Sequence, residues 1–178
     1  MVKVIIASHH KLADGMGDTL KYLVPSLTDI ETISAYLDNE PIDSAVEAAL
    51  GRCQDTEDVV VFTDLLGGSV NQEFVRQVKP NVHVIAGMNL PIIMTLLLQL
   101  ENQPLSEELI TQSIEEAKNQ IIYVNQFLKE SVDDLDEDEL QVGYKGRASW
   151  RKIGGNIAWS IKCTRKVLKI AMQMVLVI

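Results

Sequence analysis

The sequence predicts an α/β fold: a doubly wound, mainly parallel four-stranded sheet with helices on both faces. Two observations predict it, namely four short runs rich in Val and Ile and the helical patterns that alternate with them. Strands buried on both faces read as nearly continuous apolar runs, and a β–α–β–α order needs crossover helices between parallel strands. A chain of 178 residues is long enough to bury the core of such a domain.

The expected elements follow one another in a regular order along the chain. The strands are expected at residues 2–7, 29–34, 58–63 and 82–87. The first helix is expected at residues 11–23, with apolar residues at helical spacing: Leu12, Met16, Leu20 and Leu23. Pro41, a favoured first-turn residue, opens the second helix, which runs to Leu50. Three further helices are expected at residues 69–78, 90–100 and 106–129, the last of them long and amphipathic.

The charge distribution divides the chain into two parts. The net charge of −9 argues against a nucleic-acid-binding protein, which needs a basic face. All 25 acidic residues lie within residues 1–140, whereas residues 141–178 hold eight of the 16 basic residues and no acidic one. We therefore predict a boundary near Gln141, with one domain in residues 1–140 and a basic C-terminal tail in residues 141–178 that carries no recognisable motif.

The cysteine pattern and the hydropathy indicate a soluble cytoplasmic protein. Cys53 and Cys163 lie far apart and have neither metal-binding nor redox-motif spacing, so we expect two free thiols in a reducing compartment. The opening apolar run, residues 4–7, is too short for a signal peptide. No run reaches the roughly 18 apolar residues that a membrane span requires.

Candidate catalytic residues lie at the ends of the first and third expected strands. His9 and His10 come at the end of the first strand, and Asp64 follows the third. In a doubly wound sheet these two strands are expected to be neighbours, so His9 and Asp64 would meet at the carboxyl edge, where such folds bind ligands. Neutral imidazole is a nucleophile, and a carboxylate that accepts its other N–H fixes the tautomer. The pair therefore predicts a histidine whose free nitrogen can attack phosphorus.

A glycine-rich loop supplies the complementary part of this predicted site. Gly67 and Gly68 allow the backbone to approach a ligand closely. Ser69 is expected to be the N-cap of the following helix, with Gln72 completing a capping box. The free N–H groups and the positive end of this helix would then face the same crevice. A phosphoryl group on His9 would meet these donors, and phosphoryl transfer needs mainly positioning and charge stabilisation.

Each of these features also has a simpler interpretation. A histidine at the end of a strand is more often structural than catalytic, and an Asp-x-x-Gly-Gly-Ser string is commonly a turn with a helix cap. Asn89 is expected to cap the fourth helix at another carboxyl strand end, so it and His10 are accessory candidates only. His83 is expected at the opposite end of the fourth strand. Adjacent His9 and His10 side chains would diverge in extended backbone, so we expect no metal site.

A resemblance to a known family rests on four sequence blocks in the correct order. They are VIIASH at residues 4–9, KLADG at 11–15, VFTDLLGGS at 61–69 and VIAGMNLP at 84–91. Through them, residues 2–130 resemble the mannose-family IIA component of bacterial phosphoenolpyruvate-dependent sugar phosphotransferase systems. The resemblance implies that His9 is the phosphorylated histidine, that Asp64 orients it, and that Ser69 with the adjoining backbone holds the phosphoryl oxygens. No cofactor is expected.

The same resemblance implies the partners. The phosphoryl group would arrive from the phosphohistidine of the carrier HPr and leave to a IIB component. That component phosphorylates sugar during uptake through the membrane subunits IIC and IID. Members of the family are typically homodimers in which the sheet gains a fifth, antiparallel edge strand from the partner subunit. Such a strand would come from residues 120–140, where residues 121–124 are a candidate within a helical pattern.

Two positions depart from the family pattern, and two related functions stay open. His10 stands where the family usually has Gly, and Val70 stands where it usually has Pro. A histidine after His9 would either crowd HPr docking or compete for the phosphoryl group. The alternatives are the phosphotransferase subunit of dihydroxyacetone kinase and a regulatory IIA-like module, although this sequence shows none of the additional domains usual in such chains. The sugar cannot be inferred, because a IIA component never touches it.

Overall fold

The computed structural model describes residues 2–25, 30–38, 41–133, 150–153 and 156–159. Contacts divide the chain into two units, Met1–Ile121 and Ile122–Ile178. Among the described residues, the first unit holds a four-stranded sheet with its helices, and the second holds one helix and a two-stranded hairpin. None of the described helices is long and apolar enough to cross a membrane.

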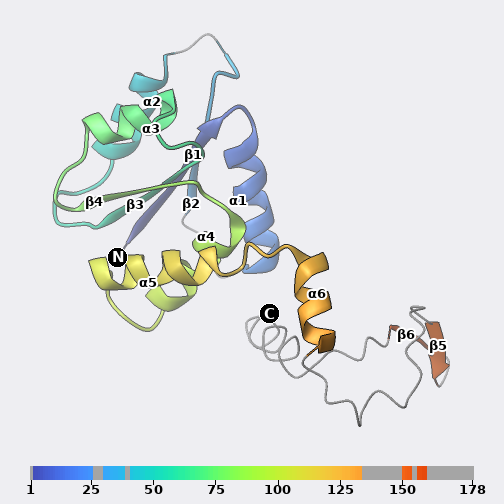
Figure 1. The fold of residues 1–178 in the computed structure, drawn as a ribbon. Coiled ribbons are helices and arrows are strands. Elements are labelled where there is room, and N and C mark those ends of the chain that lie inside the picture. The colour runs from blue at the N-terminus through green and yellow to red at the C-terminus, as the bar shows by residue number, and fades with distance from the viewer. Residues whose placement is uncertain (1, 26–29, 39–40, 134–149, 154–155, 160–178) are drawn as a thin grey trace. The chain divides into compact units, whose positions relative to one another are not determined.

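Four parallel strands form the sheet of the first unit (Figure 1). They are β1 (Lys3–His9), β2 (Ile30–Ala35), β3 (Val59–Thr63) and β4 (Val82–Ala86), in the spatial order β2-β1-β3-β4. The chain winds outward from β1 in both directions, so the order reverses between β1 and β3. The carboxyl ends of these two strands therefore form the switch point, where doubly wound sheets bind ligands. The predicted parallel, doubly wound sheet is confirmed.

Helices cover both faces of this sheet because its strands are apolar on both sides. Val4 and Ile6 of β1 belong to one core cluster, together with residues of α1 (Leu12–Leu23), α4 (Leu90–Leu100) and α5 (Glu107–Lys118). Ile5 and Ala7 belong to the other cluster, with residues of α2 (Ile42–Gly51) and α3 (Ser69–Arg76), which lie together in Figure 1. Because successive side chains of β1 point to opposite faces of the sheet, this strand contributes to both core clusters.

The predicted strands and the first four predicted helices agree with the structure to within two residues at either end. The prediction of one long helix at residues 106–129 is wrong, because two helices occupy this stretch: α5 and α6 (Val124–Asp133). After Lys118 the backbone hydrogen bonds change to the 3₁₀ type, since the N–H groups of Gln120 and Ile121 each donate to the carbonyl three residues earlier. Such a change is how helices commonly end. The amphipathic pattern continued across this break and concealed it.

The second unit contains α6 and an antiparallel hairpin of β5 (Trp150–Ile153) and β6 (Asn156–Trp159). The predicted boundary near Gln141 lies outside the described residues, as does most of the predicted tail. The expected edge strand at residues 121–124 is not a strand within this chain, since residues 121–123 are irregular and Val124 begins α6. Its exchange between two subunits stays a prediction, because it requires a second copy.

Candidate active site

The turn after β1 fixes the position of His9. Ser8, which is fully buried, accepts a hydrogen bond at its Oγ from the N–H of Ala13, 2.6 Å away, and so ties the strand to α1. The N–H of His10 donates to the carbonyl of Ala35 at 2.8 Å. His10 has a φ of +53°, in the left-handed region that favours glycine. The backbone at this position therefore has a conformation that glycine adopts most easily, as expected for a family that usually has Gly here. His10 adopts it at a conformational cost.

Asp64 follows β3 and holds His9 at two points. Its Oδ2 accepts hydrogen bonds from the backbone N–H and from the ring Nδ1 of His9, each at 2.8 Å, while Oδ1 accepts from the N–H of Leu65 at 2.8 Å. The Asp64 side chain is only 9% exposed. Burial raises the pKa of Asp64, but the hydrogen bonds from His9 and Leu65 outweigh it and leave this pKa below its usual value. The carboxylate is therefore ionised at neutral pH.

This pairing determines the tautomer of the His9 ring. An ionised carboxylate has no hydrogen to donate, so Nδ1 must carry the proton that it gives to Asp64. In the neutral imidazole Nε2 then keeps its lone pair. The Oγ of Ser69 lies 3.1 Å from Nε2, and the His9 side chain is 36% exposed. A nucleophilic nitrogen thus faces outward at the carboxyl edge of the sheet.

The two glycines of the loop after β3 bring the backbone close to the imidazole. Gly67 has a φ of +74°, which glycine adopts readily. A Cβ on Gly68 would lie 3.2 Å from Cε1 of His9, so a side chain there would press on the ring. The N–H of Gly67 donates to Oδ1 of Asn71 at 3.0 Å, and that of Gly68 to the carbonyl of Leu65 at 3.1 Å. Both N–H groups are engaged, so the glycines shape the loop.

The expected role of Ser69 as N-cap is wrong. Gly68 is the N-cap of α3, no side chain caps it, and Ser69 is the first helical residue. The hydroxyl of Ser69 is directed instead at His9, and Gln72 donates its Nε2–H to the carbonyl of Gly67 at 2.8 Å rather than forming a capping box. Within the described part of the chain, the N–H groups of Ser69 and Val70 have no hydrogen-bond partner. Donors at the start of α3 are therefore free beside His9.

One residue beside His9 was missed from the sequence: Tyr36, directly after β2. Its hydroxyl donates to Oγ of Ser69 at 2.8 Å. Its ring stacks on the His9 imidazole, with the ring centroids 5.6 Å apart and an interplanar angle of 24°. The argument that strand ends meet at one edge, applied to the second strand as well, would have pointed to it, because β2 is also a neighbour of β1.

The remaining candidates lie apart from this cluster. Asn89 caps α4 as predicted, since its Oδ1 accepts from the N–H of Ile92 at 3.1 Å. His83 lies near the start of β4, at the opposite end from His9. Among the described contacts, none joins the side chain of His10 or Asn89 to His9. No group of three or more His, Cys, Asp or Glu residues in the described part of the chain could hold a metal ion.

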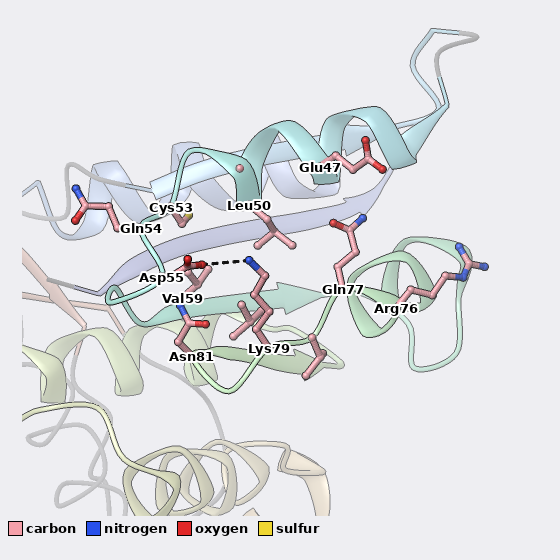
Figure 2. A pocket seen from close by; sticks show the side chains of 13 residues that line it. Glu47, Leu50, Cys53, Gln54, Asp55, Val59, Arg76, Gln77, Lys79 and Asn81 are labelled. Atoms are coloured by element: carbon pink, nitrogen blue, oxygen red, sulfur yellow. Dashed lines mark hydrogen bonds and ion pairs between the residues drawn. The ribbon is translucent and has the colours of Figure 1, made fainter.

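A pocket of about 440 Å³ lies at the other edge of the sheet, where β3 and β4 begin (Figure 2). Its lining has no histidine, and Lys79 pairs there with Asp55 at 3.3 Å. Cys53 also lines it, and burial followed by the charge of Glu57 raises the pKa of this thiol. The Cys53 thiol is therefore not an activated nucleophile, in contrast to the oriented imidazole of His9.

Fold and site together define a doubly wound α/β protein with an oriented histidine nucleophile at its switch point. The family described as the PTS system fructose IIA component matches residues 3–114. The chain belongs to this family of phosphotransferase-system IIA components, as the mannose-type resemblance predicted. Membership supports a role in a sugar phosphotransferase system.

Solved structures of phosphotransferase-system proteins are similar to this chain. A protein from Klebsiella pneumoniae subsp. pneumoniae MGH 78578, proposed to be a phosphoenolpyruvate-dependent sugar phosphotransferase system permease, is 35% identical, with a TM-score of 0.67 over 71% of this chain and 93% of that one. The PTS IIA protein associated with the fucose utilization operon of Streptococcus pneumoniae is 25% identical, with a TM-score of 0.59 over 71% and 96%.

A third structure shows the fold alone. The mannose/sorbose-specific IIA subunit of Enterococcus faecalis is 21% identical, with a TM-score of 0.56 over 67% of this chain and 92% of that one. The comparison with curated proteins gave no match.

Proposed function

We propose that this protein carries a phosphoryl group on Nε2 of His9, accepting it from phospho-HPr and passing it to a IIB component for sugar uptake. One observation carries the proposal: Asp64 holds Nδ1 of His9 at 2.8 Å, which leaves the lone pair on Nε2 at the exposed side of the site. The family supports the setting, and the 35%-identical Klebsiella relative is itself named for a sugar phosphotransferase system.

The transfer step follows from this tautomer. The Nε2 lone pair attacks phosphorus, the P–N bond of the donor phosphohistidine breaks, and the bonding pair leaves with the donor imidazole. His9 keeps its proton on Nδ1, so its ring becomes positively charged as the new P–N bond forms. The Asp64 carboxylate, already hydrogen-bonded to Nδ1, stabilises that charge without moving. No proton transfer is needed at this site.

The start of α3 offers the donors for the transferred group. The Ser69 hydroxyl lies 3.1 Å from Nε2, and the N–H groups of Ser69 and Val70 are free of partners among the described residues. A helix N-terminus also favours negative charge. We therefore propose that Ser69 and this first turn hold the phosphoryl oxygens, with Gly67 and Gly68 giving the loop its shape.

Transfer onward is the reverse of transfer inward. A nucleophile of the IIB component attacks the phosphorus, and the bonding pair returns to Nε2, which regenerates the neutral imidazole. Both steps exchange one covalent bond to phosphorus for another of similar kind. The protein need only position the group and stabilise its charge, as phosphoryl transfer generally requires.

The test is phosphorylation of the purified full chain by phosphoenolpyruvate, enzyme I and HPr, followed by intact mass. Wild type, His9→Ala, His10→Ala and His83→Ala are compared, the last as a histidine control at the opposite end of the sheet. We expect an acid-labile gain of one phosphoryl group that is lost only in His9→Ala. Loss in His10→Ala alone would move the site by one residue, and a folded wild type that gains no mass would overturn the proposal.

A further inference from the structure

Tyr36 contacts two members of the site, and the proposed mechanism leaves it without a role. It follows Ala35 at the end of β2, and its side chain is about half exposed. The hydroxyl donates to Ser69, and the ring stacks on His9. These contacts bring together the carboxyl ends of β1 and β2 and the start of α3. These two contacts make Tyr36 part of the site.

The hydrogen bonds form a directed chain. A serine hydroxyl has a single hydrogen and two lone pairs. Because Tyr36 donates to Oγ of Ser69 at 2.8 Å, the Ser69 hydrogen is left for Nε2 of His9, 3.1 Å away. Nδ1 of the same ring donates to Asp64 at 2.8 Å. Tyr36 thus donates to Ser69, Ser69 to His9, and His9 to the carboxylate of Asp64, where this series of hydrogen bonds ends.

The backbone of Tyr36 indicates that its position is imposed by the surroundings. Its φ is +63°, a left-handed conformation that is uncommon and costly for an aromatic residue. Such a conformation persists only when other contacts hold it. Within the described residues, this side chain makes a hydrogen bond to Ser69 and a ring contact with His9. The strained residue is thus coupled directly to the nucleophile.

We infer that Tyr36 is a positioning residue: its hydroxyl holds the Ser69 hydroxyl as a donor, and its ring covers one face of the His9 imidazole. The inference rests on the proposed function, because the group positioned is the phosphoryl acceptor. Before transfer, Ser69 donates to Nε2. Once Nε2 is bonded to phosphorus, that lone pair is gone, and Ser69, still accepting from Tyr36, donates to a phosphoryl oxygen.

The hydroxyl and the ring of Tyr36 are expected to have separate effects. Loss of the hydroxyl frees Ser69 to rotate, which should slow transfer by about two- to tenfold, the range of one neutral hydrogen bond. Loss of the ring uncovers the imidazole, which should shorten the lifetime of the phosphohistidine as water gains access. Tyr36→Phe removes only the hydroxyl, whereas Tyr36→Leu removes both.

The experiment is a double-mutant cycle in the full chain. The rate of phosphorylation by phospho-HPr and the half-life of the phosphorylated protein are measured for wild type, Tyr36→Phe, Ser69→Ala and the double variant. Tyr36→Leu completes the series. Tyr22→Phe serves as the matched control, because Tyr22 is an exposed tyrosine of α1 outside the site. NMR records the His9 ring protons, whose resonances a stacked aromatic ring shifts.

We expect Tyr36→Phe to slow transfer in the wild-type background and to have no further effect with Ser69→Ala. Tyr36→Leu should also shorten the half-life and move the His9 resonances, whereas Tyr22→Phe should do neither. Equal effects of Tyr36→Phe in both backgrounds, or no effect in either, would overturn the inference while the proposed function stands. If wild type accepts no phosphoryl group, the proposed function fails, and unmoved His9 resonances in Tyr36→Leu would then reject the stacking role as well.

Discussion

Replacing Asp64 with asparagine removes the charge beside His9 and keeps the size of the side chain. In wild type, Asp64 accepts three hydrogen bonds, two from His9 and one from Leu65. Asparagine has one carbonyl oxygen, so its NH₂ group must face either the His9 donors or the N–H of Leu65. An unmatched buried donor costs about 1–3 kcal/mol, so Asp64→Asn should be less stable but folded.

The larger effect is expected on phosphoryl transfer. Two unit charges about 4 Å apart interact by ~4 kcal/mol at an effective dielectric constant of about 20. If roughly half of the positive charge has developed on the ring in the transition state, about 2 kcal/mol is lost, and full development loses about 4. These losses correspond to a rate ~30- to ~1,000-fold lower. The amide can also hold the wrong tautomer of His9, which adds to the loss.

Rapid-quench measurement of transfer from phospho-HPr tests this prediction. Asp55→Asn is the matched control, because Asp55 is an exposed carboxylate at the opposite edge of the sheet, where it pairs with Lys79. We expect the control to transfer at the wild-type rate. Transfer by folded Asp64→Asn within about threefold of wild type, a change of only ~0.7 kcal/mol, would refute the reasoning and remove Asp64 from the mechanism.

The same substitution has a pH signature. Because the folded-state pKa of Asp64 lies below its usual value, the carboxylate contributes stability that is present above about pH 4 and is lost as the pH falls through the folded-state pKa. The difference in free energy of unfolding between wild type and Asp64→Asn should therefore shrink as the pH falls below about pH 4. Urea unfolding at a series of acidic pH values measures it, and a difference that grows as the pH falls below about pH 4 would contradict the assigned sign.

Three further substitutions test separate parts of the structure. Ser69→Ala should slow transfer by about 0.5–1.5 kcal/mol in activation free energy, measured by the same rapid-quench assay, with the free energy of unfolding nearly unchanged. Gly68→Ala places a methyl group 3.2 Å from Cε1 of His9 and from the carbonyl oxygen of Leu65, so we expect roughly tenfold slower transfer from a displaced ring and little loss of stability. Gly17→Ala places a Cβ 2.6 Å from Cγ2 of Thr32, so urea unfolding should show a net loss of about 1 kcal/mol, from crowding of ~1–3 kcal/mol less the helical advantage of Ala.

Each of these substitutions has an outcome that contradicts its basis. Unchanged transfer in Ser69→Ala would exclude its hydroxyl from the phosphoryl site. Wild-type transfer in Gly68→Ala would show that the ring tolerates the added methyl group. Thr32→Ser removes Cγ2, so it should restore the stability of Gly17→Ala, and failure of this rescue would place the cost elsewhere.

The sequence predicts the sheet and the meeting of its strand ends because these features depend on strong local patterns. The run VVVFT at residues 59–63 is almost entirely apolar and fully buried, as a strand covered on both faces requires. Once the strands are parallel and β1 is central, the residues directly after β1 and β3 must lie at one edge. That geometry alone brings His9 to Asp64, as the 2.8 Å contact records.

Other features depend on tertiary contacts that a local pattern does not contain. Ser69 has the composition of an N-cap, but its hydroxyl bonds to Tyr36 and His9 instead, and this preference exists only once three loops have met. Tyr36 itself has no local motif, since its role comes from a left-handed backbone after β2. The end of α5 near Lys118 was hidden because residues 121–124 continue the apolar spacing of a helix.

The most direct test of the account is to identify which nitrogen of His9 bears the phosphoryl group. Long-range proton–nitrogen NMR correlations of the ¹⁵N-labelled phosphoprotein distinguish the two phosphohistidine isomers. The contact of Nδ1 with Asp64 at 2.8 Å predicts phosphorylation at Nε2 alone. A phosphoryl group on Nδ1 would mean that Asp64 releases the ring during transfer, and it would contradict the mechanism derived from this site.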